Sequence, residues 1–142
     1  MIARTYDESK IRAILRDKDA MTFASVDDVD FETCDLLVYD LCYLLSDAGL
    51  YMFKYMSLYL AEVHVCLYPE FRGKALTHSL EAVNWAFSNM GVVRIMAFIP
   101  VTNERARKHA IKVGFKTEGY VPKSVKQGGV LVDQHMLGLG GQ

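Results

Sequence analysis

The chain has 142 residues, of which 51% are hydrophobic, and its formal net charge at pH 7 is −1. This length and composition predict one domain with a hydrophobic core, residues 1–142, without room for a second domain. No apolar stretch approaches the roughly 20 residues that a membrane-spanning helix needs, and the N-terminus lacks an apolar signal-peptide core. We therefore expect a cytoplasmic protein with no membrane partner.

The cysteines exclude two further classes of protein. Cys34, Cys42 and Cys66 are odd in number, widely separated and without a C-x-x-C spacing. This pattern suggests neither a disulfide framework nor a zinc site, so no metal is predicted. We expect these side chains to be reduced, buried thiols.

Charge is divided unevenly along the chain. Residues 1–47 contain 5 Lys and Arg against 11 Asp and Glu, whereas residues 48–142 contain 11 against 6. The basic half could receive an anionic ligand and the acidic half a cationic one, although solvated surface charge explains the same pattern. Nucleic acid is not an expected partner, because the pI is near 6.4 and the basic residues are not interleaved with aromatic ones.

The N-terminal segment predicts a short extended stretch followed by a helix. The spacing Thr5-x-x-Glu8 is a capping box, and it begins a helix that runs to about residue 18. Residues 19–36 mix aspartates with isolated apolar residues, which suits a loop or a short helix. The apolar stripe of the first helix is Ile11, Ile14 and Leu15.

The middle of the chain predicts three strands and a helix. Segments rich in Tyr, Leu, Val, Phe and Met lie at about 37–46, 49–57 and 59–68, with a turn at Asp47-Ala48-Gly49. Because their connections are short, these strands should form an antiparallel meander. A helix follows from Ala75 to Gly91, and its apolar positions at helical spacing are Leu76, Leu80, Val83 and Phe87.

The C-terminal part predicts a strand at 92–100, a helix that Asn103 caps and Gly114 ends, and two strands at 115–121 and 130–139. Strands that are joined by a helix should be parallel, and strands that are joined by short turns should be antiparallel. The element order therefore predicts an α+β fold with a mixed sheet.

The stretch "YPEFRGKALTHSL", residues 68–80, joins the meander to the second helix. Free backbone N–H groups at a helix N-terminus, aided by the macrodipole, favour phosphate oxygens. Arg72 and Lys74 add positive charge there, and Gly73 permits close approach of the backbone. The turn is therefore a candidate phosphate site, although an ordinary strand-to-helix turn can carry the same residue types.

Two stretches resemble the GNAT superfamily of N-acetyltransferases. "LYPEFRGKAL" is similar to the signature P-E-x-R-G-K-G-x-G, whose turn holds the pyrophosphate of coenzyme A. "NERARKHAIKVGFKTEGY", residues 103–120, is similar to the later N-x-x-A, K-x-G-F and E-G pattern. The resemblance covers nearly the whole chain, and it implies a mixed, mostly antiparallel sheet of about seven strands with about four flanking helices.

The resemblance also implies a co-substrate, acetyl-CoA, and the residues that hold it. The strand at about 62–67 would splay from the next strand, and the pantetheine arm would bond the backbone of Val65 and Leu67. Asn103 would contact the arm or hold the start of its helix. The residues implied to lie against the pyrophosphate are Arg72, Gly73, Lys74, Ala75, Leu76 and Thr77.

Three positions depart from the family pattern. Ala75 stands where the signature has glycine, and Thr77 stands where it has a smaller residue, so both should add atoms that face the phosphates. Ala110 stands where many members have a tyrosine that protonates the leaving thiolate, although some members lack it. The neighbouring His109 should point to the surface, because one residue turns a helix by about 100°.

A general base is expected on the strand before the signature. Glu62, His64 and Cys66 alternate with apolar residues, so their side chains should share one face and could meet an amine. Glu62 matches the base of some family members, and histidine has an intrinsic pKa near 6.5, which suits proton removal. We therefore name Glu62 and His64 as candidate catalytic residues, the alternative being a partly solvated face.

Three functions remain open from the sequence. The chain could transfer acetyl groups from acetyl-CoA to a primary amine of a small molecule or protein. It could instead be a catalytically inactive GNAT-like interaction protein, such as a phage head-assembly or virion-associated protein, or a coenzyme A sensor. The acceptor amine is not identified, and the Tyr and Met residues of segment 50–60 would permit a homodimer or a protein partner.

Overall fold

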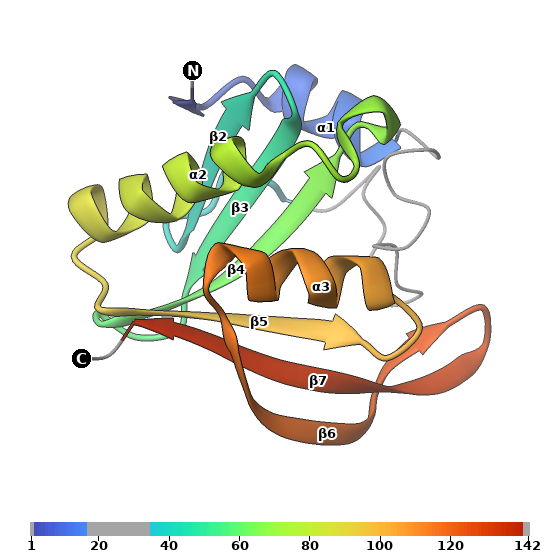
Figure 1. Ribbon diagram of the computed structural model, residues 1–142. Helices are drawn as coiled ribbons and strands as arrows, with labels where there is room; N and C mark the ends of the chain where they lie inside the picture. Colours follow the sequence, from blue (N-terminus) through green and yellow to red (C-terminus); the bar gives the residue numbers. More distant parts are fainter. Residues whose placement is uncertain (1, 17–34, 141–142) are drawn as a thin grey trace.

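The computed structural model describes residues 2–16 and 35–140. Within these residues the chain forms seven strands, three α-helices and one short 3-10 helix (Figure 1). In chain order they are β1 (Ala3–Thr5), α1 (Glu8–Arg16), β2 (Leu41–Ser46), β3 (Gly49–Tyr55), β4 (Leu60–Leu67), η1 (Pro69–Phe71), α2 (Leu76–Asn89), β5 (Arg94–Pro100), α3 (Glu104–Val113), β6 (Lys116–Gln127) and β7 (Val130–Gly140).

The seven strands form one sheet in the order β1-β2-β3-β4-β5-β7-β6. Only β4 and β5 are parallel neighbours in this sheet, and the other neighbours are antiparallel. The predicted α+β fold with a mostly antiparallel sheet of seven strands is confirmed. The described residues contain three α-helices rather than about four, and most of the segment at 19–36 lies outside the described residues.

The prediction that helix-joined strands are parallel is wrong for β1 and β2, which pair in antiparallel fashion, with Ala3 opposite Leu45. A helical crossover gives parallel strands when the chain enters the second strand soon after the helix. Here residues 17–40 lie between α1 and β2, and a connection of that length does not constrain the strand direction.

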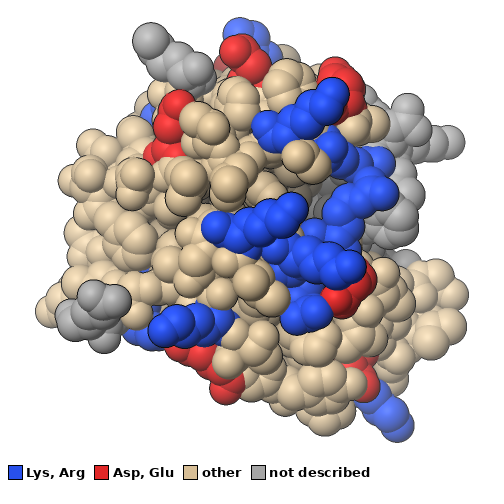
Figure 2. Space-filling view, in the orientation of Figure 1, with Lys and Arg blue, Asp and Glu red and all other residues tan. Residues whose placement is uncertain are grey.

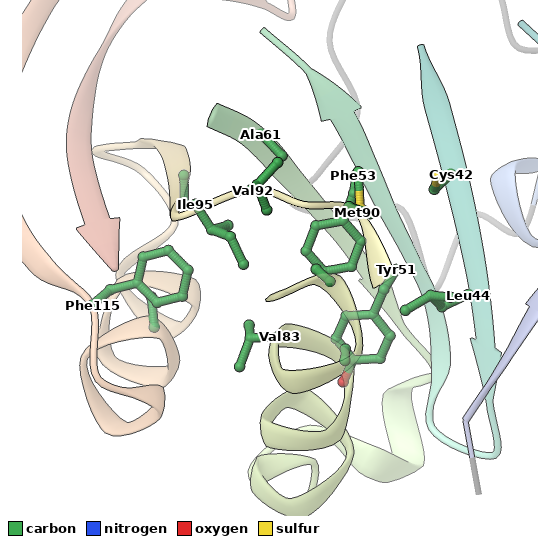
Figure 3. Close-up of a cluster of buried hydrophobic side chains, with 14 of the residues drawn as sticks. Cys42, Leu44, Tyr51, Phe53, Ala61, Val83, Met90, Val92, Ile95 and Phe115 are labelled. Carbon is green, nitrogen blue, oxygen red and sulfur yellow. The ribbon is translucent and has the colours of Figure 1, made fainter. Parts of the chain in front are cut away.

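Helices cover both faces of the sheet. Figure 1 shows α2 and α3 across the near face, and the main core lies between them and the strands. Tyr51, Phe53, Val83 and Ile95 are part of this core and point toward one another in Figure 3. On the opposite face α1 packs on β2, β3 and β4 through its predicted stripe, which is buried as expected: Ile11, Ile14 and Leu15.

The buried side of α2 differs in part from the predicted one, since Val83 is buried and Phe87 packs against the core as expected. Leu76 and Leu80 are exposed, although their spacing placed them on the apolar stripe. The helix buries small residues instead, which lets its backbone pack close to the sheet. These residues are Ser79, Ala82, Val83 and Ala86.

Helix ends follow local hydrogen bonding. The predicted capping box is wrong, because the N–H of Lys10 donates to the side chain of Asp7, which takes the capping place predicted for Thr5, and α1 begins at Glu8. Asn103 caps α3 as predicted, with its Oδ1 accepting the N–H of Ala106 at 3.2 Å. Gly114 ends α3 in the left-handed conformation that favours glycine.

The predicted reduced, buried thiols are confirmed for Cys42 and Cys66, while Cys34 lies outside the described residues. Among the helices that the structure describes, none has the length and apolar character to cross a membrane.

Candidate functional site

The parallel strands β4 and β5 separate halfway along their length. Their pairing begins with Leu60 opposite Arg94 and ends with Glu62 opposite Met96, yet β4 continues to Leu67 and β5 to Pro100. Figure 1 shows the two strands starting side by side and diverging toward their C-terminal ends. This is the splay that the resemblance implied, and its wide end lies next to the turn that opens α2.

The divergence exposes backbone groups of β4. The N–H of Tyr68 donates to the carbonyl of Ala48 at 2.9 Å, in register with the pairing of β3 and β4. Backbone groups along a strand alternate between its two sides, so Val65 and Leu67 direct theirs away from β3 and toward β5. The pairing with β5 has already ended there, and these groups can bind an extended ligand.

The turn after β4 carries the predicted anion-binding features. η1 leads to Gly73, whose φ of +81° lies in the region that only glycine adopts easily. The first hydrogen bond of α2 runs from the N–H of Ser79 to Ala75, and the helix has no side-chain cap. The N–H groups of Leu76 and Thr77 therefore lack helical acceptors, and both residues are exposed.

One expectation about this turn is wrong. Ala75 was expected to add a methyl group that faces the phosphates, but the residue is 0% exposed and belongs to the core. The extra carbon relative to glycine therefore packs inward and does not narrow the turn. Thr77 is exposed, in the first turn of α2.

Positive charge gathers on the same face. Figure 2 shows a band of Lys and Arg side chains across the side of the molecule that carries α2 and α3. Glu104 forms an ion pair with one of these residues, Arg107. The exposed basic residues of the turn and of α3 are Lys74, Arg105, Lys108 and Lys112, and Arg72 is half-buried beside them.

Glu62 and His64 share the face of β4 that is opposite to α2 and α3, as predicted. His64 Nε2 lies 3.3 Å from Glu62 Oε1, with 49% of the His64 side chain and 20% of the Glu62 side chain exposed. Burial alone would raise the pKa of the Glu62 carboxyl, but the hydrogen bond and charge of His64, together with Lys54, lower it. Glu62 is thus an ionised, weakly basic group that orients the imidazole.

Cys66 does not join this pair, although it lies on the same face. Its side chain is buried in the cluster beneath α1, and burial raises the pKa of its thiol to about 12. A thiol with this pKa stays protonated and is a poor nucleophile. Of the predicted row of three side chains, only those of Glu62 and His64 are therefore partly exposed.

The structure adds a buried chain of hydrogen bonds that the sequence did not predict. Ser79 Oγ lies 2.7 Å from Tyr51 Oη and 2.7 Å from His109 Nε2. The sequence predicted His109 on the surface, but the residue is half-buried. Burial is the main cause that lowers the pKa of its imidazole, and the charge of Lys112 lowers it further. Burial also raises the pKa of Tyr51 to about 12. The chain joins β3, α2 and α3 beside the diverging strands.

No protein-family model matches this sequence, and no curated protein sequence matches it significantly. Solved structures do match it. The spermidine N-acetyltransferase from Vibrio cholerae, in complex with CoA and spermine, has a TM-score of 0.79 at 18% identity, over 99% of this chain and 94% of that one. A GNAT-family acetyltransferase from Bacillus anthracis has a TM-score of 0.74 at 18% identity, over 98% of this chain and 93% of that one.

A third match is the ribosomal-protein-S5-alanine acetyltransferase from Vibrio fischeri, with a TM-score of 0.64 at 21% identity, over 71% of this chain and 62% of that one. These likenesses show that the chain has the GNAT acetyltransferase fold. The fold that the two sequence stretches implied is therefore confirmed.

Proposed function

We propose that this chain is an N-acetyltransferase that moves the acetyl group of acetyl-CoA to a primary amine. The observation that carries the proposal is the end of β4–β5 pairing at Glu62 and Met96, next to a basic helix N-terminus. A ligand that lies along the unpaired side of β4 would thus reach from the phosphate-binding groups at the turn toward the Glu62–His64 pair. The CoA complex of a protein with the same fold supports this assignment of the co-substrate.

The turn and α2 would hold the pyrophosphate. The N–H groups of Leu76 and Thr77, the hydroxyl of Thr77 and the charges of Arg72 and Lys74 all favour phosphate oxygens. Gly73 shapes the turn, and a Cβ there would meet no atom within 4 Å, so the backbone is open to a ligand.

The backbone groups of Val65 and Leu67 that face β5 would bond the pantetheine amides. Asn103 acts through the start of α3, which its side chain caps.

His64 would act as the base, with Glu62 as its orienting partner. The imidazole removes a proton from the substrate ammonium, and the amine nitrogen then forms a bond to the thioester carbonyl carbon. The resulting tetrahedral intermediate carries its negative charge on the former carbonyl oxygen, which needs a hydrogen-bond donor nearby. Collapse breaks the C–S bond, the nitrogen releases its second proton to solvent to give the neutral amide, and the thiolate takes a proton from solvent, since Ala110 supplies none.

Release of free thiol from acetyl-CoA, measured across a panel of primary amines, tests this proposal. We expect amine-dependent release that falls most in His64→Ala and by a smaller factor in Glu62→Gln, while acetyl-CoA still binds. Binding without release for any amine would favour a sensor. Absence of both would favour the interaction protein, such as a phage head-assembly or virion-associated protein.

A further inference from the structure

An open hollow of about 380 Å³ lies on the sheet face that carries Glu62, outside the residues assigned so far. Met96 and Phe98 of β5 and Met136 of β7 line it, together with Met56 and Tyr59. Small-molecule sites commonly have volumes of about 300–1,000 Å³ and mostly apolar walls. The hollow has the size and the lining of such a site.

The hollow lies beside one of the two candidate catalytic residues, Glu62. Met96 is in register with Glu62, so the two side chains project from neighbouring strands to the same face. Phe98 belongs to the part of β5 that no longer pairs with β4. The apolar surface therefore runs from the start of the two strands past Glu62 and into their divergence.

A glycine makes room for an ion pair in the lining of the hollow. Gly138 of β7 lies in register with Met96, and a Cβ there would overlap Arg94 and Glu118. These two residues form an ion pair across Gly138, and they are the charged residues that line the hollow. Since each neutralises the other, the lining offers little net charge to a polycation.

We infer that this hollow binds the body of the acceptor, and that the acceptor is a primary amine with a single positive charge and an aromatic or branched apolar body. The ammonium lies at the carboxylate of Glu62, and the body lies on Met96, Phe98 and Met136. This inference rests on the proposed function for the role of the bound amine. It differs from a polyamine acceptor, because a chain of several ammonium groups would need several unpaired carboxylates along its path.

Methyl NMR of the full chain with ¹³C-labelled methionines tests the inference directly, with 2-phenylethylamine as the probe and spermidine as the polycationic comparison. We expect saturable shifts of Met56, Met96 and Met136 with 2-phenylethylamine. Met90, which is buried in the core on the other face, should not shift.

Two exposed tyrosines supply matched variants. Tyr59→Ala removes a wall of the hollow and should weaken binding of 2-phenylethylamine by about tenfold, the lower end of what a hydrophobic pocket contact contributes. Tyr39→Ala, at an exposed position away from the hollow, should leave binding unchanged.

Three results would overturn the inference: no saturable shift of the lining methionines, equal shifts with spermidine, or equal weakening by the two tyrosine variants. A separate titration with acetyl-CoA tests the proposed acetyl transfer independently of the acceptor. Binding of 2-phenylethylamine without binding of acetyl-CoA would reject acetyl transfer, and binding of acetyl-CoA without the amine would reject only the acceptor.

Discussion

Glu62 and Met96 form the last residue pair between two parallel strands that both continue beyond it. Paired parallel strands satisfy their backbone groups along the whole shared length. Strands that separate inside a sheet leave those groups to another partner, and unsatisfied backbone groups are costly when buried. The pair therefore marks the point beyond which the backbone groups of β4 no longer bond β5 and are open to a ligand.

Charge reversal at the turn tests the anion site. Lys74→Glu should weaken the binding of acetyl-CoA by more than about tenfold, because it replaces attraction to the pyrophosphate by repulsion. Lys126→Glu, an exposed position on β6, makes the same change in net charge and should alter the affinity little. Calorimetry at two salt concentrations compares them. Equal losses in both variants would mean that only net charge matters.

Roles within the Glu62–His64 pair can be separated by kinetics. If His64 is the base and Glu62 orients it, His64→Ala should lower kcat/KM by about 100-fold or more, and Glu62→Gln by a smaller factor. His64→Gln serves as a control for the loss of bulk and should be as inactive as the alanine variant. Stopped assays with saturating acetyl-CoA give these ratios. A larger loss for Glu62→Gln than for His64→Ala would reverse the two roles.

The sequence predicted most of the fold because its hydrophobic periodicity and its turn residues indicate the same helices and strands. The turn at Asp47–Gly49, the strands on either side of it and the cap at Asn103 all depend on neighbouring residues, and all are confirmed. The antiparallel pairing of β1 and β2 could not be predicted in this way, because it depends on contacts between segments that are far apart in the chain.

The candidate site was only partly readable for the same reason. Glu62 and His64 share a face because of strand geometry alone, and that was predicted. The burial of Ala75 and the contact between Ser79 and His109 depend on how α2 and α3 rotate against the sheet. A serine where α2 faces the core was the one local signal, since a buried hydroxyl needs a partner.

Loss of the Ser79 hydroxyl should destabilise the fold. Ser79→Ala leaves Tyr51 Oη and His109 Nε2 without their shared partner, and a buried unsatisfied polar group costs about 1–3 kcal/mol. Ser88→Ala, an exposed position on the same helix, is the matched control and should change stability little. Urea denaturation gives both free energies of unfolding. A loss at Ser79 no larger than at Ser88 would contradict the buried network.

The pH dependence of stability should carry a contribution from His109. Its pKa in the folded protein is below the ordinary value of 6.5, so below that pH the unfolded chain binds more protons than the folded one. Stability that is present above pH 6.5 should therefore fall as the pH falls toward the lowered value. His109→Gln should remove this part of the slope, whereas His64→Gln should keep it. An unchanged slope in His109→Gln would show that another group is responsible.

The most direct measurement is a calorimetric titration of the purified protein with acetyl-CoA, with unacylated CoA in parallel. The diverging strands, the uncapped N-terminus of α2 and the basic face predict saturable binding of both ligands with micromolar dissociation constants. No heat of binding from either ligand at millimolar concentration would mean that the path between β4 and β5 does not hold CoA, and the central claim would be wrong.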